Sequence, residues 1–253
     1  MQLHTERSRL WTPRSGRSSR VECAPLGHGI SFARPPKILS ASSSPTSISN
    51  LMAWYRSDLL VTQSGGTVSA WGDSSASGDA NRIASQATGA LQPTYSASDA
   101  NFNGLPSMTS GLASGRLLRT GTWSVALPQP YTVFAVARLL STQSNSYLCD
   151  SINGGVQSAL YSSAGTDLRA YNGSNSNSPT FASAQTGVAI GVMDSANTAS
   201  RVYWSAATPS VGVNNGTNGL TGVTLGCYAG GGTTFTDWAY AEFAYYSRAL
   251  TAG

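Results

Sequence analysis

The stretch Tyr131-Thr132-Val133-Phe134-Ala135-Val136-Ala137-Arg138 decides the fold. It is rich in β-branched and aromatic residues and contains no glycine or proline. A continuous apolar run of this kind is typical of a central β-strand that is buried on both faces. Pro128 and Pro130 come just before it. They mark the start of the strand, because proline has no amide hydrogen to donate inside a sheet.

Similar short runs fill the chain from residue 51 onward. Glycine, serine, asparagine and proline separate them, and turn signals such as Ser64-Gly65-Gly66 and Asn103-Gly104 favour hairpins. No long segment in this region has the 3.6-residue apolar period of a helix. The pattern therefore predicts an all-β, two-sheet antiparallel β-sandwich. The expected strands cover residues 51–55, 67–71, 106–110, 131–139, 146–150, 156–161, 167–171, 187–194, 200–205, 222–228 and 237–246.

Several motifs, taken in order, resemble a known family. The first are Leu51-Met52-Ala53-Trp54-Tyr55-Arg56-Ser57-Asp58, Thr67-Val68-Ser69-Ala70-Trp71-Gly72-Asp73-Ser74-Ser75, Gln92-Pro93-Thr94-Tyr95 and Asn103-Gly104-Leu105-Pro106. The later ones are residues 131–136, Leu225-Gly226 and residues 241–250. Over about residues 51–250 this set resembles the LamG-like, concanavalin A-like lectin/glucanase domains of bacteria and phages. The resemblance implies a jelly roll but no single function, since this sandwich occurs in lectins, hydrolases, adhesion modules and virion parts.

The first 37 residues differ from the rest of the chain. They hold seven basic residues against Glu6 and Glu22, a net charge of +5, whereas the remaining residues carry a net charge of −1. The composition predicts an extended basic N-terminal arm over residues 1–37, a linker over 38–50 and the sandwich over 51–253. Such an arm buries too little apolar area to fold alone, so we expect it to lie against a partner. The partner-binding residues predicted in the arm are Arg7, Arg9, Trp11, Arg14, Arg17, Arg20, Phe32, Arg34 and Lys37.

The sandwich lacks the residues that hydrolysis requires. Glucanases of the resembled family place their acids in a Glu-x-Asp-x-x-Glu arrangement on one strand, which the sequence does not contain. Asp237 lies five residues before Glu242, a spacing that points the two carboxylates to opposite faces of a strand. Both histidines, His4 and His28, lie in the arm. We therefore expect no catalytic residues, and we expect Glu242 to pair with an arginine or with backbone amides.

Cysteine and aspartate patterns argue against a metal or cofactor. The three cysteines are far apart, which favours neither a disulfide framework nor a zinc site, and Cys149 and Cys227 are expected to be buried. Calcium stays open as an alternative, because it needs oxygen ligands alone. Four aspartates lie in loop-like contexts without the spacing of a ligand loop, so the sequence predicts no metal and no cofactor. They are Asp73, Asp79, Asp150 and Asp194.

Aromatic residues fall into two groups. The first lies on the family-matching strands and is expected in the core: Trp54, Trp71, Tyr131, Phe134 and Phe243. The second could include rings that stack on a sugar: Trp123, Tyr161, Tyr171, Trp204, Trp238 and Tyr240. A carbohydrate-binding module would expose some of these rings.

Two functions follow as hypotheses. The main one is a non-enzymatic virion structural protein of a tailed phage, a capsid decoration (cement) or head-fibre protein on the particle exterior, anchored through its arm. Its partners would be the major capsid protein or other virion subunits and further copies of itself. The alternative is a lectin-like adhesion module that binds a host glycan, for example in a tail fibre. A hydrolase is the least favoured reading.

Membrane and nucleic-acid partners are less favoured. No apolar run approaches the 18 residues of a membrane span, and the N-terminus lacks the apolar core of a secretion signal. The arginines of the arm are spaced singly, with few aromatic residues between them, so a protein surface is a better partner for the arm than nucleic acid.

Overall fold

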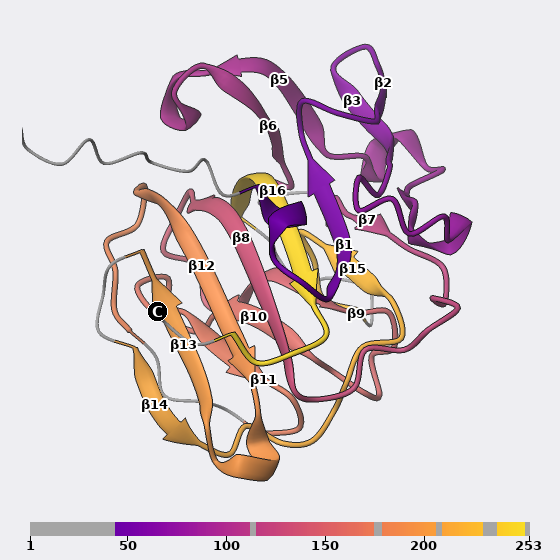
Figure 1. Cartoon of the computed structure of the whole chain (residues 1–253). Helices are drawn as coiled ribbons and strands as arrows, with labels where there is room; N and C mark the ends of the chain where they lie inside the picture. Colours follow the sequence, from indigo (N-terminus) through magenta and orange to yellow (C-terminus); the bar gives the residue numbers. More distant parts are fainter. Residues whose placement is uncertain (1–43, 112–114, 175–178, 206–208, 230–236, 251–253) are drawn as a thin grey trace, which may run out of the picture. The chain divides into compact units, whose positions relative to one another are not determined.

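The structure is a computed structural model that describes residues 44–250 except 112–114, 175–178, 206–208 and 230–236 (Figure 1). Its elements are short strands and single-turn 3-10 helices. In chain order the 3-10 helices are η1 (Pro45–Ser47), η2 (Ala80–Arg82), η3 (Gly89–Leu91), η4 (Ala100–Phe102) and η5 (Ser195–Asn197). The strands are β1 (Leu51–Arg56), β2 (Val61–Ser64), β3 (Thr67–Trp71), β4 (Ala84–Ser85), β5 (Thr94–Asp99), β6 (Leu105–Thr109), β7 (Leu118–Arg119), β8 (Tyr131–Leu139), β9 (Ser146–Ser151), β10 (Ala159–Ser162), β11 (Arg169–Tyr171), β12 (Thr186–Met193), β13 (Ser200–Trp204), β14 (Ser210–Val213), β15 (Val223–Leu225) and β16 (Trp238–Tyr246).

The strands form two layers of antiparallel sheet. The front sheet contains β14, β13, β12, β8, β16 and β1, and the back sheet contains β11, β10, β9, β15 and β7. In Figure 1, β9, β10 and β11 lie behind β8, β12 and β13. The predicted sandwich is confirmed. The two sheets are also joined along one side, because β4, β3, β5 and β6 continue the hydrogen-bonded path from β7 to β16.

The expected strands all occur, with ends that shift by at most three residues. Sequence patterns missed β2, β4, β5, β7 and β14, which are polar or very short. The turn expected at Gly65 and Gly66 joins β2 to β3, and both glycines have the positive φ angles that tight hairpins require. Residues 44–50 lie within the predicted linker, and there Ile48 packs against the outer cluster of Trp54 and Tyr246.

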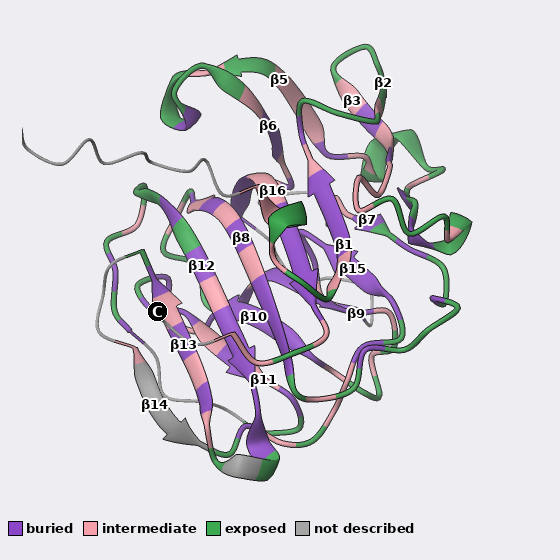
Figure 2. Cartoon of the chain, in the orientation of Figure 1, coloured by how far each residue is buried: buried purple, intermediate pink, exposed green. Residues whose placement is uncertain are grey.

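Large aromatic side chains fill the space between the sheets. Trp71 is fully buried, and its ring stacks on Tyr240 at 6.0 Å and meets Tyr55 at 5.6 Å and Phe243 at 6.1 Å. Figure 2 shows that β16, β9, β10 and β15 are buried along most of their length. Cys149 and Cys227 are buried and form no disulfide, as expected. The described residues contain no helix that is long and apolar enough to cross a membrane.

A β-bulge in β16 turns its aromatic residues toward the core. The register against β8 shifts between Tyr240 and Glu242. Before the bulge Tyr240 is in the main core, and after it Phe243 and Tyr245 are in the same core, although the alternation of a regular strand would put them on the other face. The interruption that the sequence pattern showed at Glu242 is therefore a bulge, and it leaves Glu242 outside the core.

Two glycines on the inner face of β12 make room for large neighbours. A Cβ atom at Gly187 would lie 2.7 Å from ring atoms of Trp204 and 2.6 Å from the hydroxyl oxygen of Ser205. A Cβ atom at Gly191 would lie 2.8 Å from Leu160 in the back sheet. These positions therefore set how closely the two sheets approach at β12.

Substitution of Gly187 by valine is expected to lower the free energy of unfolding by about 2 kcal/mol, because the new side chain would overpack the core against the rigid Trp204 ring. Denaturant unfolding measures this change. Gly89→Val is the matched control, since a Cβ atom at Gly89 meets no heavy atom within 4 Å. Equal stability of the two variants would contradict the packing at β12.

Candidate functional site

The face of the front sheet that points away from the back sheet, called the outer face below, carries unusual side chains for a solvated surface. Along β8 the residues that alternate with core positions are Phe134, Val136 and Arg138, all half-buried. The neighbouring strand β12 adds Val188, which is 37% exposed, and Ile190. β8 was expected to be buried on both faces, but its outer side chains are half-exposed. Partly exposed apolar side chains in contact on a sheet face make this face a candidate binding surface.

Two neighbouring depressions lie on the outer face. The first, called the polar depression, measures about 220 Å³ and lies beside the η4–β6 turn. Its lining includes Arg56, Asp58, Asn101, Asn103, Thr186 and Glu242. The second, called the apolar depression, measures about 200 Å³ and is partly covered by η1. Its lining includes Ile48, Phe134, Val188, Ala244, Tyr246 and Glu242. Val136 and Glu242 line both, so the two depressions adjoin.

Glu242 is held by an indole rather than by an arginine. The Nε1–H of Trp54 donates a hydrogen bond of 2.5 Å to Oε1 of Glu242. The prediction that Glu242 pairs with an arginine or with backbone amides is therefore wrong. Arg56 does lie opposite Glu242 in the β1–β16 register, but its guanidinium binds Asp58 instead, through two hydrogen bonds of 3.0 and 2.6 Å. The charge of Arg56 is thus already paired, and it lies over the Trp54 ring at 5.0 Å.

The polar depression combines engaged and free polar groups. The side chain of Asn101 accepts a hydrogen bond from Arg138, and its carbonyl accepts one of 2.8 Å from Thr186. Asn103 is exposed, has a φ angle of 56°, and its carboxamide makes no hydrogen bond to the described residues. Asn103 and the second oxygen of Glu242 are therefore available to a ligand.

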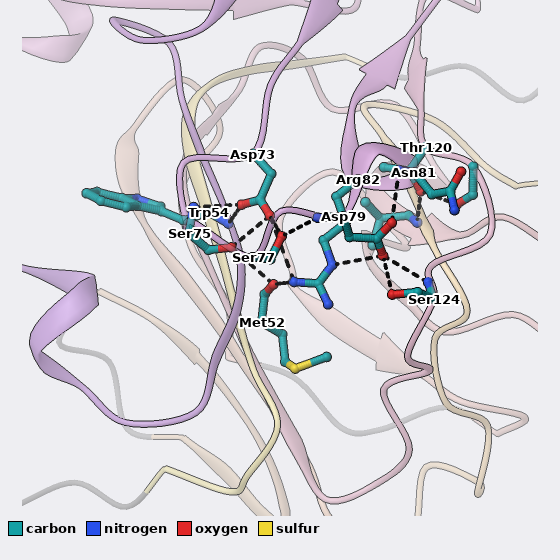
Figure 3. A network of polar contacts seen from close by, with 12 residues as sticks. Met52, Trp54, Asp73, Ser75, Ser77, Asp79, Asn81, Arg82, Thr120 and Ser124 are labelled. Carbon is teal, nitrogen blue, oxygen red and sulfur yellow. Dashed lines mark hydrogen bonds and ion pairs between the residues drawn. The ribbon is translucent and has the colours of Figure 1, made fainter.

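A buried arginine fixes the strand that carries Trp54 (Figure 3). The Arg82 guanidinium lies 3.9 Å from a carboxylate oxygen of Asp73 and 3.5 Å from one of Asp79, and it donates a hydrogen bond to the carbonyl of Met52 in β1. Asp73 in turn accepts a hydrogen bond of 2.8 Å from the amide of Trp54. The position of the Trp54 indole, and hence of Glu242, depends on this network.

The free edge of β1 is closed by side chains and loop backbone. Besides the bond from Trp54 to Asp73, the amide of Ser74 donates to the carbonyl of Trp54 at 2.6 Å. The indole of Trp71 donates to the carbonyl of Arg56 at 2.7 Å. The amide and carbonyl of Trp54 and the carbonyls of Met52 and Arg56, all on the side of β1 that faces away from β16, thus have partners without a further strand.

Replacement of Arg82 by leucine is expected to lower the free energy of unfolding by about 3 kcal/mol, because it leaves buried carboxylate oxygens without their cation. Urea unfolding followed by Trp fluorescence measures this loss. Arg119→Leu provides the matched control, since Arg119 is exposed and forms no ion pair with the described residues. If the two variants were equally stable, the network would not hold β1.

The predicted partner-binding residues of the arm all lie outside the described residues. They are Arg7, Arg9, Trp11, Arg14, Arg17, Arg20, Phe32, Arg34 and Lys37. The structure therefore places none of them relative to the depressions, and the arm remains a prediction.

The aromatic residues divide differently from the expectation. Trp71, Tyr131 and Phe243 are in the main core as expected. Trp54 is also buried, but in the smaller outer cluster, and Phe134 is half-buried against that cluster. The rings considered for sugar stacking are mostly buried: Trp123, Tyr161, Trp204, Trp238 and Tyr240. The sequence reasoning missed Phe134 and Tyr246 as site residues. One signal was present, since β8 is apolar on both of its alternating faces and only one face of a sandwich strand meets the core.

The four aspartates considered for calcium are not gathered. The described residues contain no group of three acidic, histidine or cysteine side chains that could hold a metal ion. Asp150 instead accepts hydrogen bonds from the amides of Ser151, Ser158 and Ala229 at 2.7, 2.9 and 3.0 Å. Burial is the larger effect there, and it raises the pKa of Asp150 to about 6.

Comparison with solved structures identifies the fold. The receptor-binding domain of botulinum neurotoxin C/D mosaic serotype matches 80% of this chain and 49% of its own length, with a TM-score of 0.51 and 7% identity. The fold is that of the concanavalin A-like jelly rolls. At this identity the likeness shows the fold alone.

Two further solved structures match with lower TM-scores. The receptor-binding domain of botulinum neurotoxin type G has 11% identity and a TM-score of 0.48, with 80% of this chain and 49% of that chain covered. Trypanosoma rangeli sialidase in complex with sialic acid has 12% identity and a TM-score of 0.43, with 81% and 32% covered. The chain thus spans from a third to half of the structures it matches. No family model and no curated protein matches the sequence.

Proposed function

We propose that the jelly roll is a non-catalytic glycan-binding module and that its ligand lies in the polar depression. The observation that carries the proposal is the pair of free polar groups, the Asn103 carboxamide and one Glu242 oxygen, that line one depression. Amide and carboxylate groups match sugar hydroxyls as donors and acceptors. The apolar side chains of Leu105 and Val136 line the same depression and suit the apolar face of a sugar ring.

The lack of catalysis is part of the proposal. Asp58 and Glu242 both line the polar depression, so two carboxylates are present, as a glycosidase would need. Both oxygens of Asp58, however, accept hydrogen bonds from Arg56, and one oxygen of Glu242 accepts the Trp54 indole. The Arg56 guanidinium thus pairs the charge of Asp58 and stabilises its ionised form, which makes Asp58 a weaker nucleophile and base.

Asn103→Gly tests the glycan site. Glycine keeps the positive φ angle and removes the carboxamide, so the fold is retained while the hydrogen bonds to a sugar are lost. A glycan array identifies a ligand of the unmodified protein, and calorimetry then measures its affinity. We expect about fivefold weaker binding in the variant, the value of one hydrogen bond.

Asn145→Gly serves as the control, because Asn145 has a similar φ angle of 54° and is exposed but lines neither depression. An array without hits, or equal weakening by both substitutions, would contradict the glycan site. Release of reducing sugar from a bound glycan would contradict the non-catalytic assignment.

We further propose that the module is displayed on the exterior of a tailed-phage particle, anchored through residues 1–37. The support is the composition of that segment, with its net charge of +5 beside a nearly neutral domain. Deletion of residues 1–37 is expected to abolish co-sedimentation with capsids while the thermal unfolding of the sandwich stays unchanged. Retained co-sedimentation of the folded, truncated protein would refute the anchor.

A further inference from the structure

We propose that the apolar depression is a separate site for an alkylated ammonium group, such as the trimethylammonium head of choline. Its walls are apolar and partly aromatic. The rings of Phe134 and Tyr246 meet edge to face, with centroids 5.7 Å apart and planes at 84°. The rest of the apolar lining is Pro45, Ile48, Val136, Val188 and Ala244. Tyr246 is 2% exposed and supports the half-buried Phe134, which is the ring that a cation can approach, and aromatic rings attract cations.

The apolar depression contains one negative charge, that of Glu242, and few polar groups that are free to bind a ligand. The hydroxyl of Tyr246 donates a hydrogen bond of 3.1 Å to the carbonyl of Pro45, so it is already used. Glu242 accepts the Trp54 indole at Oε1, and its Oε2 has no hydrogen-bond donor among the described residues. No ion pair involves Glu242 within that part of the chain.

The nearby cations do not neutralise this carboxylate. Arg56 lies opposite Glu242 in the register, but it is paired with Asp58. Burial is the main cause that raises the pKa of Tyr246; the Glu242 carboxylate raises it further, and the exposed Arg248 lowers it by less than Glu242 raises it. An anionic ligand is therefore disfavoured in this depression and a cationic one is favoured.

The number of free acceptors selects the type of cation. A primary ammonium carries three N–H donors and loses water from each on entering an apolar site, but the depression offers it a single free carboxylate oxygen. A neutral hexose would likewise leave most of its hydroxyls without partners. A quaternary ammonium has no N–H donor, and its methyl groups can pack against Phe134, Val136 and Val188 while its charge faces Glu242.

The ligand therefore differs from the glycan proposed for the polar depression, although Glu242 lines both. The full-length protein is titrated with choline chloride by calorimetry and by NMR, and 3,3-dimethylbutan-1-ol, the uncharged carbon analogue of choline, provides the comparison. Choline is expected to bind saturably at one site and at least about tenfold more tightly than the alcohol.

Glu242→Gln is the decisive variant, because glutamine keeps an oxygen that accepts the Trp54 indole and removes only the charge. It is expected to weaken choline binding about tenfold and to leave the weak binding of the alcohol unchanged. Phe134→Leu is expected to weaken choline as well, since it removes one ring. Asn103→Gly is expected to leave choline binding unaltered, which separates this site from the glycan site.

Three results would overturn the proposal: no saturable choline binding by protein whose unfolding transition is intact, equal binding of choline and its uncharged analogue, or full choline binding by Glu242→Gln. The second would make the depression a plain apolar site. Loss of glycan binding with choline binding retained, or the reverse, would identify which of the two sites had failed.

Discussion

The guanidinium of Arg82, buried between Asp73 and Asp79, is the interaction on which the site depends. It is contributed by a single-turn helix far from the front sheet in sequence, and yet it binds the carbonyl of Met52 in β1. Through Asp73 the same network holds the amide of Trp54. The buried Arg82 guanidinium thus fixes the position of β1, and β1 positions the Trp54 indole that binds Glu242. The orientation of Glu242 on the outer face therefore depends on contacts made at the edge strand β1.

The bulge in β16 gives one strand two tasks. It directs Tyr240, Phe243 and Tyr245 into the core, where rings in contact hold the two sheets together. It also leaves Glu242 on the outer face, between a polar and an apolar depression. A regular strand with the same residues would have placed either the aromatic side chains or the carboxylate on the wrong side. The β-bulge therefore permits a charged group in the middle of a strand that is buried over most of its length.

Sequence patterns predicted the sandwich because hydrophobic runs such as 131–139 have to form its inner strands. They missed β2 and β5, whose polar residues become strands through pairing with β3 and β6. Sequence patterns could not predict most of the site, because Trp54 and Glu242 are 188 residues apart and come into contact only in the folded structure. Asn103 was recognised as a turn residue, but nothing local indicates that its carboxamide is left free beside β16.

The closed edge of β1 has a consequence for self-association. A strand with unpaired amides and carbonyls is a template for another chain, and natural sheets block such edges to avoid fibrous aggregation. In this domain Asp73, Ser74 and Trp71 already bind the amide and carbonyl of Trp54 and the carbonyl of Arg56, groups that an added strand would need. A strand added beside β1 would have to break these hydrogen bonds first, so this edge of the front sheet is protected against pairing with a second copy.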